Sequence, residues 1–216
     1  MFSHIRKNGL LLGAFALGTT SIIALTYTLT HEKIAQAREQ QLLSTLNQVI
    51  PKQMHDNDLH LDCLKVPADP LLGEKAQRVF RSRLLENNTA IAIETTAPNG
   101  YSGAIDLVVA VNIENSILGV RTINHKETPG LGDKIDHRLS DWIFDFDNKQ
   151  YSDDTGQRWQ VKKDGGQFDQ FTGATITPRA VIAAVKNATI YIKQNSTYLY
   201  NAQSNCLTTP LTEDKQ

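Results

Sequence analysis

The sequence predicts an α+β domain that follows a single N-terminal membrane-spanning helix. Three observations carry this prediction: an uncharged apolar run at 9–30, three successive segments rich in Val, Ile and Thr, and a long amphipathic helix pattern after them. The 216 residues are enough for one domain with a substantial core. The formal net charge of -1 gives no reason to expect a nucleic-acid partner.

The apolar run at 9–30 contains no charged residue, and crossing a hydrocarbon core takes roughly 20 helical residues. A cleaved signal peptide is the alternative, but its apolar stretch is usually shorter and ends at a small-x-small site, whereas this run ends in LTYTLTHEKI. We therefore expect an uncleaved anchor, which in a bacterial protein would lie in the inner membrane, with lipid as a partner. Arg6 and Lys7 favour a cytoplasmic N-terminus and a periplasmic domain, although Lys33 and Arg38 weaken this signal.

The segments after the anchor have distinct patterns. Apolar residues at helical spacing predict a helix over 31–50 that Pro51 ends. The polar, proline-punctuated stretch that follows, up to residue 73, is expected to be irregular. Residues 74–86 are expected to form a helix.

The second half of the chain predicts an antiparallel meander and a packed helix. The expected strands are 88–97, 104–113 and 116–125, with turn signals between them, and a shorter strand at 157–163. Residues 178–194 carry the apolar stripe of a helix that would pack on the sheet.

We accordingly divide the chain into four parts. These are the cytoplasmic N-terminus and transmembrane helix (1–30), the juxtamembrane helix and connector (31–73), the main domain (74–195) and a C-terminal tail (196–216). Cys63 and Cys206 lie near the two ends of the outer part, where an oxidising compartment favours a disulfide between them. The alternative is two unrelated thiols.

The stretch Thr172-Gly173-Ala174-Thr175 precedes a helix-start signature, Thr177-Pro178, in which Thr is expected to be the cap and Pro the first helical residue. Free N–H groups at a helix start favour an anion, so the local chemistry suits a phosphate beside Thr175. The simpler interpretation is that the hydroxyls only cap the helix.

The longer string at 169–175 favours a phosphate site over a simple helix cap. Residues 169–175 match D-x-x-[S/T]-G-A-[T/S], the pattern of bacterial FMN-binding domains in which a flavin transferase attaches FMN through its phosphate. Residues 125–135, HKETPGLGDKI, resemble the E-T-P-G-L-G loop of the same family, and 100–105, GYSGAI, resemble its G-Y-x-G-x-I entry to a central strand. The three motifs follow the family's order.

The resemblance implies covalent FMN on Thr175, with no residue acting as a catalytic group and no metal. Glu127 would organise the loop after it, and Lys126 would lie near the ring, although a structural ion pair is the alternative for both. The cofactor-binding residues implied by the resemblance are Thr175, Thr172, Gly173, Ala174, Glu127, Thr128, Pro129, Gly130, Leu131, Gly132, Tyr101 and Ser102.

Together with the anchor and the chain length, these motifs resemble the RnfG family, the G subunits of the Rnf (Rsx) electron-transport complex. The resemblance implies an electron-carrier component of an ion-translocating oxidoreductase of the ferredoxin/NAD type, not an independent enzyme, whose partners are the other subunits and a flavin transferase. The related alternative is the C subunit of the sodium-pumping NADH:quinone reductase, which is usually longer. A further alternative is a membrane-anchored periplasmic interaction module without a cofactor.

Other functions have weaker support. Neither TGAT nor YSGAI is the G-x-S-x-G of a hydrolase. His55, His60, Asp62 and Cys63 are metal-ligand types, but their spacing matches no standard site. Two cysteines are too few for an iron–sulfur cluster within this chain.

Overall fold

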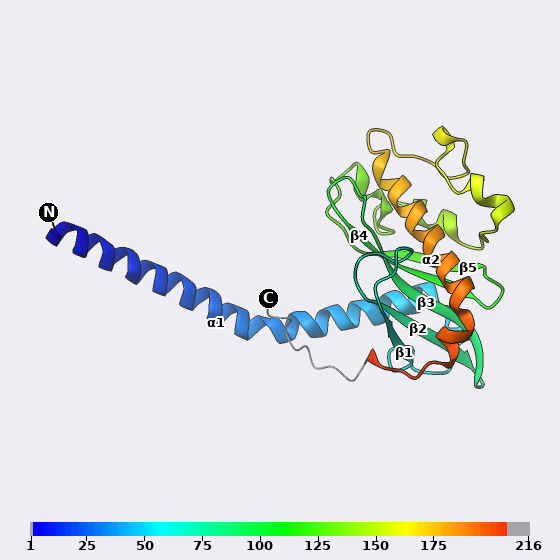
Figure 1. The fold of residues 1–216 in the computed structure, drawn as a ribbon, viewed down its shortest axis with the longest axis horizontal. Coiled ribbons are helices and arrows are strands. Elements are labelled where there is room, and N and C mark those ends of the chain that lie inside the picture. Colours follow the sequence, from blue (N-terminus) through cyan, green and yellow to red (C-terminus); the bar gives the residue numbers. More distant parts are fainter. Residues whose placement is uncertain (1, 207–216) are drawn as a thin grey trace. The chain divides into compact units, whose positions relative to one another are not determined.

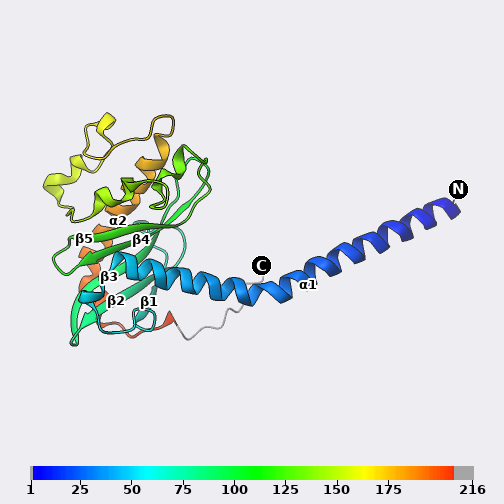
Figure 2. The ribbon, with the colours of Figure 1, turned by 180° about the vertical axis from the view of Figure 1, so that it is seen from behind.

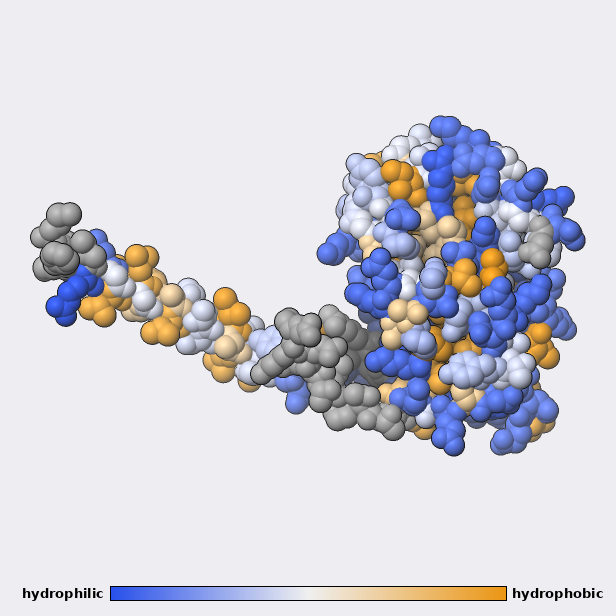
Figure 3. Space-filling model, viewed as in Figure 1, coloured by the Kyte–Doolittle hydropathy of each residue, from blue (hydrophilic) through white to orange (hydrophobic). Residues whose placement is uncertain are grey.

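The computed structural model describes residues 2–206, which divide after Leu42 into two compact units (Figure 1). The first unit is the greater part of helix α1 (Phe2–Val49). Within it, Arg6–Ile34 is long and apolar enough to cross a membrane, and none of its most apolar stretch is buried. Figure 3 shows hydrophobic side chains uncovered along this part of α1, as expected of a helix that contacts lipid.

The expected anchor and juxtamembrane helix are one continuous helix, and α1 ends at Val49, just before Pro51. Proline cannot donate the next helical hydrogen bond, so the stop predicted from the sequence is confirmed. The residues of α1 from Leu43 onward belong to the second unit.

The second unit contains a five-stranded antiparallel meander in the order β1-β2-β3-β4-β5. The strands are β1 (Cys63–Val66), β2 (Gln77–Leu84), β3 (Asn87–Ala97), β4 (Ile105–Asn112) and β5 (Ile117–Asn124). The predicted α+β class and the three strands predicted between 88 and 125 are confirmed.

Two expectations for the sheet were wrong. Residues 74–86 are not a helix, because Gln77–Leu84 is strand β2, which pairs with both β1 and β3. The β2–β3 hairpin turns at Leu85 and Glu86, both of which have positive φ; without Gly or Asn there, the usual turn signal was absent. The stretch before β2 was expected to be irregular but contains β1.

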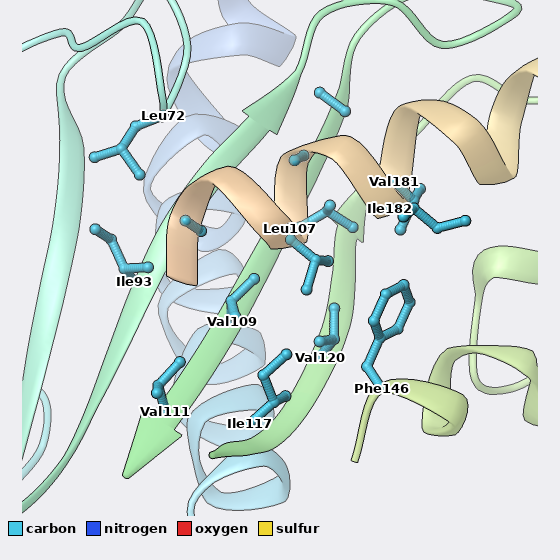
Figure 4. Packing of buried hydrophobic residues seen from close by; sticks show 14 of the residues in the cluster. Leu72, Ile93, Leu107, Val109, Val111, Ile117, Val120, Phe146, Val181 and Ile182 are labelled. Atoms are coloured by element: carbon cyan, nitrogen blue, oxygen red, sulfur yellow. The ribbon is translucent and has the colours of Figure 1, made fainter. Parts of the chain in front are cut away.

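The two faces of the sheet are covered differently. Helix α2 (Ile176–Asn201) covers one face, where large side chains such as Ile93, Leu107 and Val109 form the core with Val181 of α2 (Figures 1 and 4). The last turns of α1, from Leu43 onward, cross the other face (Figure 2).

That second face has a small residue where the helix crosses. A Cβ at Gly119 of β5 would lie 3.2 Å from Val49 Cα, so glycine permits the close approach. Leu46, Val49 and Ile50 are fully buried. From Leu43 onward, the end of α1 is therefore part of the domain's core, and the apolar residues predicted there at helical spacing have a packing partner.

An irregular layer with four short 3-10 helices fills the chain between β5 and α2. They are η2 (Gly132–Ile135), η3 (Asp141–Phe146), η4 (Asp153–Arg158) and η5 (Lys162–Asp164). The strand expected at 157–163 was wrong, since that stretch runs from η4 into η5 and makes only a single bridge, Val161 with Phe168. Aromatic rings hold this layer together: Trp142, Phe146, Trp159, Phe168 and Phe171.

The chain after α2 returns to the edge strand β1. Cys63 Sγ is bonded to Cys206 Sγ, 143 residues away in the sequence. The Asn205 N–H donates to Cys63 O at 3.0 Å, and the Lys65 N–H donates to Asn205 Oδ1 at 2.6 Å. These contacts occupy the backbone groups of an edge strand that would otherwise be unpaired.

Candidate functional site

A cavity of about 240 Å³ forms where the three sequence motifs meet. The first motif contributes Tyr101, the second contributes four residues, and the third contributes two, with a further residue from the start of α2. The lining residues are Tyr101, Glu127, Thr128, Leu131, Gly132, Gly173, Ala174 and Thr177. Segments that are separated in the sequence thus form one site.

The first segment is the turn that joins β3 to β4. Gly103 in this turn has φ +125, a conformation that favours glycine. Tyr101 is 68% exposed at the rim of the cavity. Ser102 does not line the cavity, but its backbone N–H donates to Glu127 Oε1 at 2.9 Å.

The second segment is the loop that leaves β5. Thr128 O accepts the N–H groups of Leu131 and Gly132, both at 3.1 Å, which closes a tight turn leading into η2. Gly130 has φ +77, and it stands with Pro129 at the exposed tip, outside the cavity lining. The turn directs Leu131, which is 42% exposed, to the cavity wall.

The third segment, residues 169–175, is held by the aromatic layer. Trp142 Nε1–H donates to Asp169 O at 2.8 Å, and the Phe171 ring packs on Trp142 with centroids 5.0 Å apart. Gly173 has φ +82, so the backbone turns sharply before the helix. The Asp169 carboxylate faces outward and pairs with Lys162 at 2.6 Å.

The start of α2 differs from the sequence prediction. The helix begins at Ile176 with Thr175 as its N-cap residue, and the Thr175 side chain makes no capping hydrogen bond in the described structure. Thr177 was expected to be the cap, which was wrong: it lies fully buried in the first turn, and its hydroxyl donates to Glu127 Oε2. Pro178 is consequently the third helical residue and not the first.

The three threonine hydroxyls near the site therefore have different environments. Thr172 is exposed outside the cavity lining, and Thr175 is half-buried next to the lining residue Ala174. Thr177 is buried and already bonded to a carboxylate. Of these three threonines, Thr175 is the one that is both partly exposed and at the N-cap of α2.

Glu127 is a buried residue of the lining, 4% exposed. Among residues 2–206 its side chain has no ion-pair partner within 4.0 Å; its partners are the Ser102 amide and the Thr177 hydroxyl. The ion pair considered as an alternative for Glu127 is thus not seen in the described residues. Lys126 is exposed, and its position relative to a cofactor stays a prediction.

Shifted pKa values occur beyond the pocket, in the chain that follows η2. Hydrogen bonds from the Arg138 guanidinium lower the pKa of Asp136 to about 2. Burial, and then the charge of Arg121, lower the pKa of His137. Burial raises the pKa of Asp147, although Arg121 partly opposes this. None of these groups lines the cavity, where Glu127 stands among uncharged residues.

Two of the four candidate metal ligands have other roles. Asp62 pairs with Arg81 and Arg83 at 2.5 and 2.8 Å, and Cys63 is in the disulfide. Within the part of the chain that the structure describes, no group of three or more His, Cys, Asp and Glu residues is placed to hold a metal ion.

Comparison with known families first defines the class. Residues 100–189 match the model of the FMN-binding domain, a range that contains all three motifs, and residues 1–49 match the model of the RnfG N-terminal region. The fold and the site thus define a membrane-anchored protein with an FMN-binding domain.

Whole-chain relatives specify the family. A protein of Vibrio atlanticus (strain LGP32) is 50% identical over 206 residues, covering 95% of this chain and 99% of its own. One from Pseudoalteromonas atlantica (strain T6c / ATCC BAA-1087) is 50% identical over 203 residues, 94% of each chain. Both are named as the G subunit of an ion-translocating oxidoreductase complex. This chain belongs to the family of these G subunits, and the predicted family is confirmed.

Proposed function

We propose that this chain is the membrane-anchored electron carrier of an ion-translocating oxidoreductase complex and that its FMN is esterified to Thr175. Family membership and the FMN-binding domain make it a redox component that works with other subunits and not alone. The observation that carries the site assignment is the Thr175 hydroxyl, which makes no capping hydrogen bond in the described structure and stands at the start of α2, beside the cavity that the three motifs line.

The electrostatics of this position suit a phosphodiester. The first N–H groups of a helix lack intrahelical acceptors, and the positive end of the helix dipole stabilises an anion there by roughly 0.3–1 kcal/mol at an exposed site. Gly173 and Ala174, just before the cap, leave the backbone accessible to a phosphate. Thr172 is close enough in sequence to supply a hydroxyl to the same group.

Attachment replaces one bond to phosphorus by another. Thr175 Oγ1 forms the ester bond to the flavin phosphate and gives up its proton, while phosphorus releases the group that it carried in the donor. That group leaves as water from FMN or as a nucleoside monophosphate from a flavin dinucleotide. In either case the chain gains the mass of FMN less one water. A separate flavin transferase is the expected catalyst.

The cavity suits part of a flat ring system. FMN supplies one- and two-electron transfer when bound. Leu131 and Tyr101 offer apolar surface, and the backbone of the second and third motifs can approach closely. At about 240 Å³ the cavity is smaller than the ~300–1,000 Å³ usual for sites that enclose a small molecule. We infer that part of the flavin stays accessible for electron exchange with other subunits.

We place the flavin domain in the periplasm. Arg6 and Lys7 precede the apolar segment of α1, and basic residues favour the cytoplasmic side. The disulfide between Cys63 and Cys206 supports the same orientation, because such bonds persist in oxidising compartments.

The intact mass of the denatured chain tests the proposal. The full chain is exported to the periplasm with an active flavin transferase, as wild type, Thr175→Ala, Thr175→Ser and Thr172→Ala. We expect the added mass in the wild type and in the two variants that keep a hydroxyl at 175, and its absence in Thr175→Ala. A wild type without added mass, or a Thr175→Ala chain that retains it, would refute the assignment.

A further inference from the structure

One buried carboxylate links the β3–β4 turn, the loop after β5 and the first turn of α2. Glu127, in the loop after β5, accepts the Ser102 N–H at Oε1 from the turn between β3 and β4. Its other oxygen, Oε2, accepts the Thr177 hydroxyl from the first turn of α2. The lining residues on either side of the cavity are therefore fixed relative to one another through this single side chain.

Two motif glycines make room for the carboxylate. A Cβ on Gly100 would lie 2.9 Å from Glu127 Oε1, and a Cβ on Gly132 would lie 2.8 Å from Oε2 and 2.9 Å from Thr177 Oγ1. Contacts this short displace the atoms involved, so a side chain at either position would break the linkage. At Gly132 the need for glycine follows from Glu127 and Thr177, whereas at Gly100 the nearest atom to such a Cβ is Gly103 O, at 2.3 Å.

The charge of Glu127 faces the cavity without a cationic partner in the described residues. Its two oxygens accept from the Ser102 amide and the Thr177 hydroxyl. His125 Nδ1 accepts the backbone N–H of Glu127 at 3.2 Å and does not pair with the carboxylate. Stabilisation comes instead from the Ser102 amide and the start of α2.

We propose that Glu127 is the positioning residue of the flavin site, which ties the first two motifs to the start of α2, directly after the third motif, and lowers the midpoint potential of the flavin through its negative charge. This inference rests on the proposed FMN site. Reduction adds negative charge to the flavin, and a carboxylate at the wall of a low-dielectric pocket opposes that charge.

Glu127→Gln separates the charge from the geometry. The glutamine carbonyl can accept the Ser102 N–H, and its amide can donate to the Thr177 hydroxyl, which serves equally as an acceptor. Glu114→Gln is the matched control, because it removes one negative charge at an exposed position in the β4–β5 turn. We expect FMN-loaded Glu127→Gln to have a more positive midpoint potential in redox titration, and Glu114→Gln to match the wild type. Equal potentials in all three proteins would overturn the proposal.

The linkage itself is tested without flavin. Thr177→Val removes the donor and leaves a buried carboxylate oxygen unpaired, whereas Thr177→Ser keeps the hydroxyl. We expect the unloaded full chain with Val to unfold at a lower denaturant concentration than the chain with Ser. A Val variant at least as stable as the Ser variant would overturn the linkage, even if Glu127→Gln failed to fold or to load. A wild type that carries no FMN would instead refute the proposed function, and the comparison at Thr177 would still decide the linkage.

Discussion

Removing the disulfide tests how the chain end is held to the sheet. The bond between Cys63 and Cys206 closes a loop with a sequence separation of 143 residues, for which the chain-entropy relation gives a stabilisation of about 5 kcal/mol. That is a large share of the ~5–15 kcal/mol typical of a domain. We therefore expect Cys63→Ala/Cys206→Ala to lower the free energy of unfolding by up to this amount.

Urea unfolding of the full chain in detergent, followed by tryptophan fluorescence, measures the effect, because Trp142 and Trp159 both lie in the buried aromatic layer. Wild type with reductant is the matched control, since it keeps both sulfur atoms. It should unfold at the same urea concentration as the double variant. Equal midpoints for oxidised wild type and the double variant would refute the reasoning, and would mean that the hydrogen bonds of Asn205 suffice to hold the chain end.

Two further predictions concern the loops around the site. A Cβ at Gly166 would lie 1.9 Å from Gln160 O, so Gly166→Ala should displace the loop before Thr175 and reduce the fraction of chains that carry flavin mass. Gly156→Ala, whose Cβ would have an ordinary 3.4 Å contact, should load normally. Arg138 lowers the pKa of Asp136 from 3.8 to about 2; the resulting stabilisation is complete above about pH 4 and is lost as the pH falls towards 2. The stability difference between wild type and Asp136→Asn in urea should therefore shrink between pH 5 and pH 2.5, and a constant difference would contradict this.

The sequence predicted correctly those elements that depend only on neighbouring residues. The apolar run that forms the anchor, the stop before Pro51 and the three strands with high β-propensity needed no information about distant contacts. Strand β2 was missed because it depends on contacts with residues that are distant in the sequence. Arg81 within it is 3% exposed, and its charge is tolerated because Asp62 and the carbonyls at the end of α2 accept its hydrogen bonds. Nothing in the local sequence indicates those partners.

The motifs predicted which segments form the site but not how they meet. Thr177 was expected to be a cap because a threonine before a proline usually is one. Instead the Thr177 hydroxyl donates a hydrogen bond to Glu127, 50 residues earlier, and the helix begins at Ile176. That contact exists only once α2 packs beside the loop after β5, so the sequence could not show it.

Localisation of the added mass shows directly whether Thr175 carries the flavin, as we propose. Trypsin releases the peptide Asp164–Arg179, which contains Thr172, Thr175 and Thr177. Fragment-ion mass spectrometry of this peptide, from chain exported with an active flavin transferase, assigns the added mass to one threonine. We expect the mass of FMN less one water on Thr175 alone. The same mass on Thr172, or an unmodified peptide, would contradict it.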